Sequence, residues 1–175
     1  MAGIARLATV SDPWLDEANL DLDLGHGARP IRVARYDGAT PEHLRKSVRE
    51  RARLLVATPD SIHSSILRMA TTRYRDNSSW ERLLAGLRYV VLDEIHSYQG
   101  VFGSNVAQVL RRLRRAAARH GATPQLLAAS ATIGNPVDLA ERLTGVAPFH
   151  LVDKDGAPQC GRTVLICNPP IATDQ

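Results

Sequence analysis

Two adjacent carboxylates, Asp93 and Glu94, follow the apolar run Tyr89–Leu92 and precede His96. Four apolar residues in a row are typical of a buried parallel strand, and functional groups of α/β sheets lie where such strands end. A carboxylate there can hold Mg²⁺, while its neighbour orients a water for attack on a phosphate. The other interpretation is a solvated strand end or helix start. The short pattern alone does not decide between the two.

Two further polar clusters follow apolar runs in the same way. Thr58, Pro59 and Asp60 follow the run 53–57, and the cluster 130–132 (Ser-Ala-Thr) follows the run 125–129. Asp60 is expected to cap the next helix, and the same loop can also offer N–H groups to a nucleic-acid phosphate. The Ser-Ala-Thr cluster is weak evidence by itself, because small residues commonly follow strands.

The rest of the chain must supply the elements that position these clusters. Apolar runs predict strands at 31–35, 53–57, 89–92, 125–129 and 163–167. Helical patterns lie at 41–51, 60–69, 79–85, 105–120 and 136–143, with Thr40 as an expected N-cap and glycines 121 and 145 as ends. Alternating strands and helices predict an α/β fold in three layers, a parallel sheet covered by helices on both faces.

Length and composition limit the class of protein. The chain has 175 residues, 44% hydrophobic and 23% charged, enough for one domain or most of one. Residues 1–30 carry five acidic residues and two arginines, which predicts a poorly packed acidic leader. We expect the domain proper over 31–170 and a short tail over 171–175.

Several classes of protein are excluded by what the chain lacks. Its only lysines are Lys46 and Lys154, and neither stands in the G-x-x-x-x-G-K-[ST] pattern of a phosphate-binding P-loop. No apolar run approaches the roughly 20 residues of a membrane span, and residues 1–10 do not form a secretory signal. Cys160 and Cys167 fit no zinc or redox spacing, so two reduced thiols in a cytoplasmic protein are expected.

The order of the three clusters resembles motifs Ib, II and III of superfamily 2 helicases of the DEAD/DEAH type. Longer segments are similar to the bacterial mitomycin-repair helicases and their fungal relatives, and they lie at 36–41 (YDGATP), 89–115, 130–136 (SATIGNP), 155–158 and 168–170. The resemblance covers about residues 36–170. It implies a RecA-like fold of the P-loop NTPase class, incomplete because the P-loop strand is missing. The P-loop segment is expected upstream, and a second RecA-like domain downstream.

The resemblance also implies roles for individual residues. Asp93 would hold Mg²⁺ on the phosphates of ATP, Glu94 would activate the attacking water, and His96 would link the site to a neighbouring motor domain. Coupling of ATP hydrolysis to strand movement would fall to Ser130 and Thr132. The residues along the DNA backbone would be Gly38, Thr40, Thr58, Pro59 and Asp60. The family resemblance further implies 3′ to 5′ movement on DNA and a role in DNA repair. Two positions depart from the family pattern, with Gln99 where arginine and Asn105 where histidine is often found.

Without a P-loop, the chain alone is predicted not to hydrolyse ATP, because water and Mg²⁺ need a positioned γ-phosphate. The strand at 125–129 is expected to have an unpaired edge. The alternatives are a non-catalytic DNA-binding or interaction module on a helicase scaffold and, less favoured, a Mg²⁺-dependent nuclease.

The segment 104–120 contains five arginines and no acidic residue. A buried stripe is expected at Val106, Leu110, Leu113 and Ala117. The arginines then form either a nucleic-acid face or, as we favour, a solvated helix face.

Overall fold

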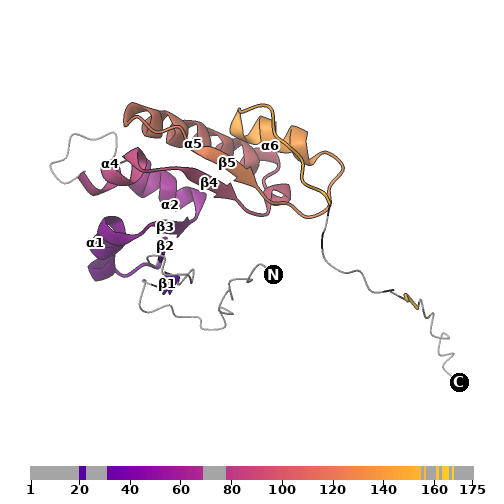
Figure 1. The fold of residues 1–175 in the computed structure, drawn as a ribbon, viewed down its shortest axis with the longest axis horizontal. Helices are drawn as coiled ribbons and strands as arrows, with labels where there is room; N and C mark the ends of the chain where they lie inside the picture. The colour runs from indigo at the N-terminus through magenta and orange to yellow at the C-terminus, as the bar shows by residue number, and fades with distance from the viewer. Residues whose placement is uncertain are drawn as a thin grey trace, which may run out of the picture.

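The computed structural model describes residues 20–22, 31–68, 78–154, 156, 161, 163–165 and 167 (Figure 1). The strands are β1 (Leu20–Leu22), β2 (Ile31–Tyr36), β3 (Leu54–Ala57), β4 (Tyr89–Leu92) and β5 (Gln125–Ala128). The helices are α1 (Glu42–Arg51), α2 (Pro59–Ser61), the π-helix η1 (Ile62–Leu67), α4 (Ser78–Ala85), the 3-10 helix η2 (Ile95–Ser97), α5 (Gly100–Arg119) and α6 (Pro136–Thr144). Most of the predicted leader and tail lies outside the described residues, and the domain boundaries stay predictions.

The strands form two sheets in the described part of the chain. β1 pairs antiparallel with β2, and β2 pairs parallel with β3, with Tyr36 opposite Ala57. β4 pairs parallel with β5, with Leu92 opposite Ala128. Parallel pairs joined through helices confirm the predicted α/β class. Because parallel strands end at the same edge, each pair brings the loops that follow it close together.

One long helix, α5, contributes side chains to both core clusters of the described residues. Its Leu113 belongs to a core cluster with Trp80 and Tyr36, against which Leu55 of β3 and Val90 of β4 also pack. Its Val106, Leu110 and Ala117 are also buried, so the predicted apolar stripe is confirmed. The first two belong to a second cluster with Leu92 and Ile95. α5 therefore positions the loop after β4 relative to the rest of the fold.

The opposite face of the strands is open and apolar. Residues that alternate with Leu55 and Val90 are 43–65% exposed, namely Leu54, Val56, Tyr89, Val91 and Leu127. No helix among the described residues covers this face, so two of the three expected layers are present in this part of the chain. Parallel sheets are normally buried on both faces, and this face therefore fits further polypeptide.

Both predicted N-caps are wrong. The N-cap position of α1 is Pro41, which makes no side-chain cap hydrogen bond, because the hydroxyl of Thr40 instead accepts the N–H of Asp37. The helix after β3 is capped by Thr58 and not by Asp60, which lies inside the first turn. Thr58 takes this role because its Oγ1 accepts from the backbone N–H of Ser61, three residues on.

Two element boundaries also differ from the prediction. α5 begins at Gly100, five residues earlier than expected, because the N–H of Gly103 donates to the carbonyl of Gln99 (3.0 Å) and extends the helix over two glycines. The strand predicted at 163–167 is not formed by its described residues. Val164 and Leu165 are 73% and 83% exposed and have no paired strand, and an isolated apolar run cannot satisfy a strand's hydrogen bonds. The predicted helix ends at Gly121 and Gly145 are confirmed by their left-handed φ values of 80° and 66°.

Candidate active site

The loops after β4 and β5 are joined by backbone hydrogen bonds. The N–H of Ala129 donates to the carbonyl of Leu92 (2.8 Å), and the N–H of Ile95 donates to the carbonyl of Ala129 (3.0 Å). These bonds continue the parallel pairing of the strands beyond their ends. The segment from Asp93 to His96 and the segment from Ser130 to Thr132 therefore leave the sheet together at one edge.

Glu94 has a left-handed backbone, with φ 52° and ψ 43°. It is the only non-glycine residue with positive φ among those the structure describes, a conformation that costs about 1–3 kcal/mol. Asp93 holds it in place, since its Oδ1 accepts the N–H of Glu94 (2.9 Å). Ser97 contributes as well, because its hydroxyl donates to the carbonyl of Glu94 (2.8 Å). The turn thus carries two exposed carboxylates at adjacent positions.

His96 contacts both loops through one ring nitrogen. Its Nδ1 lies 3.1 Å from Oε2 of Glu94 and 3.3 Å from the backbone nitrogen of Ala131. The N–H of Ala131 can only donate, so this bond requires an unprotonated Nδ1. The contact with Glu94 becomes an ion pair only when Nδ1 carries a proton. The side chain of Gln99 adds a hydrogen bond to the carbonyl of His96 (2.9 Å).

An open groove runs beside β5 and ends at the Ser-Ala-Thr loop. Its volume is about 1640 Å³, and its lining includes Ser130, Thr132 and the segment 148–153. Within the described residues, β5 pairs only with β4, so its second edge is unpaired as predicted. Both hydroxyl side chains are exposed. The groove is thus bordered by an unpaired strand edge and by a polar end.

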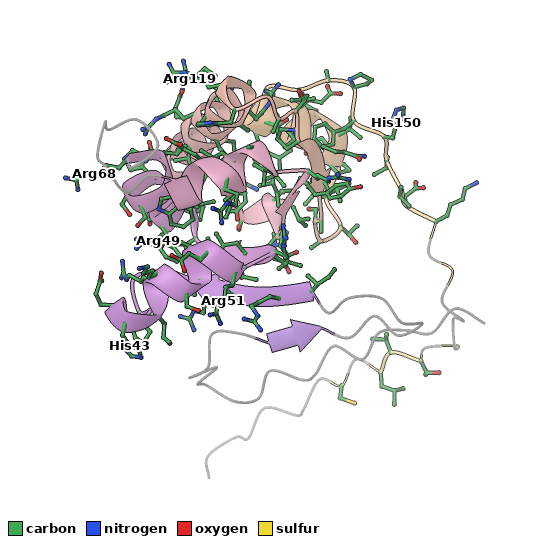
Figure 2. All side chains as sticks on the ribbon, turned by 60° about the vertical axis from the view of Figure 1, so that its left-hand side comes forward. His43, Arg49, Arg51, Arg68, Arg119 and His150 are labelled. Carbon is green, nitrogen blue, oxygen red and sulfur yellow. The ribbon has the colours of Figure 1, made fainter. Side chains whose placement is uncertain are left out.

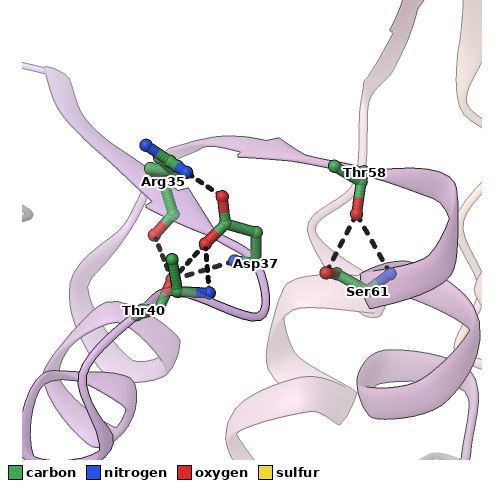
Figure 3. A network of polar contacts seen from close by, with 6 residues as sticks. Arg35, Asp37, Thr40, Thr58 and Ser61 are labelled. Carbon is green, nitrogen blue, oxygen red and sulfur yellow. Dashed lines mark hydrogen bonds and ion pairs between the residues drawn. The ribbon is translucent and has the colours of Figure 1, made fainter. Parts of the chain in front are cut away.

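A second group of predicted residues lies at the ends of β2 and β3 (Figure 3). The carboxylate of Asp37 forms an ion pair with Arg35 and accepts the N–H of Ala39 (3.0 Å). It also accepts the hydroxyl of Thr40 (3.3 Å). Burial raises the pKa of Asp37, but the hydrogen bond and charge of Arg35, with the Ala39 N–H and the Thr40 hydroxyl, outweigh it and lower the pKa below its usual value. The result is a closed turn that exposes Gly38.

The neighbouring loop is closed by Thr58. Its hydroxyl donates to the hydroxyl of Ser61 (3.0 Å) and accepts the N–H of the same residue (3.3 Å). The two loops lie side by side because Tyr36 and Ala57 are register partners at the strand ends. The structure thus brings Gly38 and Thr40 together with the segment 58–60. The side chains of both threonines are used in internal hydrogen bonds.

Comparisons with known proteins agree with this arrangement. The family model described as DEAD/DEAH box helicase matches residues 22–140. The chain belongs to the DEAD/DEAH box helicase family. This confirms the predicted family, and a RecA-like helicase domain explains the parallel strands whose ends carry the clusters.

Individual helicases of the family are similar over most of the chain. It is 43% identical to the uncharacterized ATP-dependent helicase YprA of Bacillus subtilis, over 81% of the chain and 18% of that protein. It is 36% identical to the ATP-dependent helicase HRQ1 of Saccharomyces cerevisiae, over 79% of the chain and 12% of that protein. The crystal structure of the DUF1998 helicase MrfA bound to DNA and AMPPNP is 43% identical, with a TM-score of 0.66, over 73% of the chain and 17% of MrfA. The chain thus spans less than a fifth of the length of these relatives.

A Mg²⁺ site of the helicase type needs only one or two ligands from the protein. No group of three His, Cys, Asp or Glu in the described ranges could hold a metal ion. Mg²⁺ in nucleotide sites usually takes one or two carboxylates and completes its shell with water and substrate phosphates. The exposed carboxylate of Asp93 at the end of β4 fits that requirement.

The arginines of α5 serve mainly to hold this domain of the helicase together. Arg114 donates to the carbonyls of Thr144 (3.1 Å) and Gly145 (3.3 Å), and Arg111 donates to that of Arg142 (3.3 Å), so both cap the end of α6. Arg112 contacts Nδ1 of His63 in η1 (2.6 Å). The other two arginines, Arg115 and Arg119, are exposed, and Figure 2 shows Arg119 at the outer end of the helix. Three of the five arginines thus bind within the fold and do not form the solvated face that we expected, whereas the two exposed ones agree with it.

Two features of the site were not predicted from the sequence. One is the left-handed backbone of Glu94, for which an ordinary acidic residue gives no signal. The other is the close contact of Gly103 with the loop after β4. A glycine inside a helical pattern is a signal of close packing, but only the structure shows which residue it meets.

Proposed function

We propose that the chain forms part of the first motor domain of an ATP-dependent DNA helicase that acts in DNA repair. The observation that supports this most directly is the bridge made by His96 between the loop of Glu94 and the loop of Ala131. In a motor, the residues that act on ATP must be connected to residues that respond to it, and this bridge connects two strand-end loops. The 43% identity to a DNA-bound helicase over most of the chain also supports it.

In this function, Asp93 holds Mg²⁺ and Glu94 positions the water that attacks the γ-phosphate. Mg²⁺, when bound, neutralises charge on the phosphates. The left-handed turn allows both carboxylates to serve one site, because adjacent residues of an extended strand would direct their side chains to opposite faces. Ser130 and Thr132 would carry the change in the site to the neighbouring motor domain. The proposed role of His96 is to join the two loops.

The DNA backbone would run over the ends of β2 and β3. Thr40 and Thr58 use their hydroxyls to close the two loops, so we assign them a shaping role together with Pro59. Backbone N–H groups near Gly38 and at the start of α2 would then contact phosphates. The nearby carboxylate of Asp60 is compatible with backbone contacts but not with a direct phosphate contact.

ATP hydrolysis also needs a P-loop, and the groove beside β5 is the proposed place for the strand that carries it. A strand added there would pair with the unpaired edge of β5 and end beside Ser130. The same addition would bring phosphate-binding N–H groups to the edge where Asp93 lies. The chain alone is accordingly expected to be inactive, and a second RecA-like domain would complete the motor.

The test is reconstitution of ATP turnover. The DNA upstream of Met1 is read for an open frame that encodes a G-x-G-K-[ST] segment, and this segment is expressed with the chain in one polypeptide. We expect DNA-stimulated ATP turnover from the joined protein and none from the chain alone. Glu94→Gln in the joined protein should lower kcat by about 10²–10⁴-fold, the usual contribution of a positioned acid–base group.

Each other outcome counts against a part of the proposal. Turnover by the chain alone that disappears in Glu94→Gln would contradict the predicted inactivity. A joined protein without turnover, but with salt-dependent DNA binding in the absence of nucleotide, would favour the non-catalytic DNA-binding module. Nicking of DNA with Mg²⁺ or Mn²⁺ that is lost in Glu94→Gln would favour the nuclease.

A further inference from the structure

Gly103, in the first turn of α5, occupies a position where no other residue fits. It is buried, and a Cβ atom built on it would lie 2.2 Å from the carbonyl oxygen of Tyr98 and 2.6 Å from its carbonyl carbon. Real Cβ atoms essentially never come within 3.0 Å of another residue's heavy atom. The obstacle is backbone and not a flexible side chain, so any larger residue must displace Tyr98.

The helix gains nothing locally from this glycine. Glycine inside a helix is about 1 kcal/mol less favourable than alanine, so its presence needs another reason. At Gly100 the reason is the backbone, since φ is +57° and a Cβ there would meet nothing within 4 Å. Gly103 has no positive φ, and close approach to Tyr98 is the only constraint on it in the described structure.

Tyr98 is the last residue of a tightly bonded loop that begins at Ile95. The N–H of Tyr98 donates to the carbonyl of Ile95 (3.0 Å), and Ile95 is fixed to the carbonyl of Ala129 (3.0 Å). The side chain of Gln99 holds the carbonyl of His96 (2.9 Å). A displacement of Tyr98 is therefore carried directly to His96, two residues earlier.

His96 has little tolerance for such a displacement. Its Nδ1 lies 3.3 Å from the nitrogen of Ala131, already at the long end of the hydrogen-bond range. Relieving a 2.2 Å contact to beyond 3.0 Å requires a movement that clearly exceeds the small lengthening this bond can still tolerate. The bond between the two strand-end loops would then be lost.

We propose that Gly103 is the positioning residue for His96. The absence of a side chain at position 103 lets the loop after β4 rest on the backbone of α5, and this sets the distance from His96 to the loop after β5. The consequence for ATP turnover rests on the proposed function, but the positioning itself does not.

The test uses Gly103→Ala in the 175-residue chain, with Ser104→Ala as the matched control on the next, exposed residue of the helix. The measurements are the ¹⁵N signals of the Ala131 amide and the His96 imidazole by NMR, and the cooperativity of thermal unfolding. We expect both signals to move in Gly103→Ala and to stay in place in Ser104→Ala, while the thermal transition remains cooperative. Such a shift is a local signature that a general packing defect would not produce selectively.

Two results would overturn the proposal. Unchanged Ala131 and His96 signals in a folded Gly103→Ala chain would show that the loop does not depend on this glycine. Loss of cooperative unfolding in Gly103→Ala alone would make Gly103 a residue of the whole fold and not a positioning residue. Neither measurement requires ATP or DNA, so failure of the proposed function would leave this result intact.

A second readout applies if the joined protein turns over ATP. Gly103→Ala should then lower kcat by about 10²-fold, the usual effect of a displacement near 1 Å in an active site, with KM for ATP unchanged. An unchanged kcat in the presence of shifted NMR signals would limit the role of Gly103 to the loop and contradict its importance for turnover.

Discussion

Nδ1 of His96 lies 3.3 Å from the backbone nitrogen of Ala131, and 35 residues separate the two along the chain. Because the same Nδ1 is also 3.1 Å from the carboxylate of Glu94, only one of the two contacts can be a hydrogen bond at a given protonation state. Neutral His96 with an unprotonated Nδ1 binds Ala131, and the protonated ring pairs with Glu94. His96 therefore links the two loops only when its Nδ1 is unprotonated, and it then gives up the ion pair with Glu94.

Two replacements of His96 distinguish the contribution of its hydrogen bond to Ala131 from the contribution of the rest of the ring. His96→Ala removes the acceptor and should lower the free energy of unfolding by about 1 kcal/mol, the net value of one hydrogen bond. His96→Asn keeps an acceptor oxygen near the place of Nδ1 and should retain most of that stability. Urea unfolding of the two variants at pH 7 measures the difference. Equal losses in both would show that the Ala131 contact contributes nothing measurable.

The turn closed by Asp37 should make stability depend on acid pH. The pKa of Asp37 is lower in the folded chain than in the unfolded chain. An aspartate in an unfolded chain has a pKa of about 3.9. A lowered pKa contributes stability that is fully present above the unfolded value and is lost as the pH falls through the folded value. Asp37→Asn lacks this contribution, so its stability deficit relative to wild type should shrink as the pH falls below about 4.

The measurement is urea unfolding of wild type and Asp37→Asn between pH 7 and pH 3. Asp60→Asn is the control, since Asp60 is exposed and begins no closed turn. A pH dependence larger in Asp37→Asn than in this control would belong to the closed turn. A constant deficit for Asp37→Asn across the range would contradict the ion pair and hydrogen bonds assigned to this carboxylate.

Much of this fold could be predicted from local pattern. The apolar run at β4 matched the structure residue for residue, and the spacing of Val106, Leu110 and Leu113 identified the buried stripe of α5. These features follow from the spacing of apolar residues, which is visible in the sequence of every strand or helix that packs on a core. The polar clusters at the ends of β4 and β5 were found for the same reason, since parallel strands end at one edge.

What could not be predicted is the choice between two equally good caps and the contacts between distant segments. Aspartate and threonine are both good N-caps, so the sequence did not decide between Asp60 and Thr58. Thr58 is the cap of α2 because its hydroxyl accepts the N–H of Ser61. The apolar residues Val164 and Leu165 form no strand here, because a strand needs a neighbour and the pattern does not say where it lies. The bridge from His96 to Ala131 likewise exists only after β4 and β5 have paired.

The arginines of α5 should divide into structural and solvated positions. Arg114→Ala removes two hydrogen bonds to the last carbonyls of α6 and should destabilise the chain by about 1.5–3 kcal/mol, the range for bonds with a charged donor. Arg115→Ala, at the next and exposed position, should change stability by less than about 0.5 kcal/mol. Urea unfolding checks both values.

The same pair of variants tests the nucleic-acid interpretation of the helix. If α5 is only a solvated face, Arg115→Ala leaves the affinity of the chain for a DNA oligonucleotide, and its salt dependence, unchanged. A salt slope reduced by about one unit in Arg115→Ala would show a phosphate contact at this position and overturn the interpretation as a solvated face.

The open face of the strands should cause self-association of the chain by itself. Tyr89, Val91 and Leu127 are 60%, 65% and 43% exposed, and β5 has an unpaired edge next to them in the described structure. An apolar face beside an unpaired strand edge is a template for pairing with a second copy. We expect concentration-dependent association of the wild-type chain, and less of it in the double variant Val91→Thr, Leu127→Thr, which keeps strand propensity.

Sedimentation velocity across a concentration series measures this association, with Val101→Thr as the control. Val101 is 80% exposed but lies in the first turn of α5, away from the strand residues of the open face. Its replacement removes a similar apolar side chain and should leave association unchanged. A wild-type chain that stays monomeric throughout, or a control that reduces association as much as the double variant, would show that the open face is not what brings copies together.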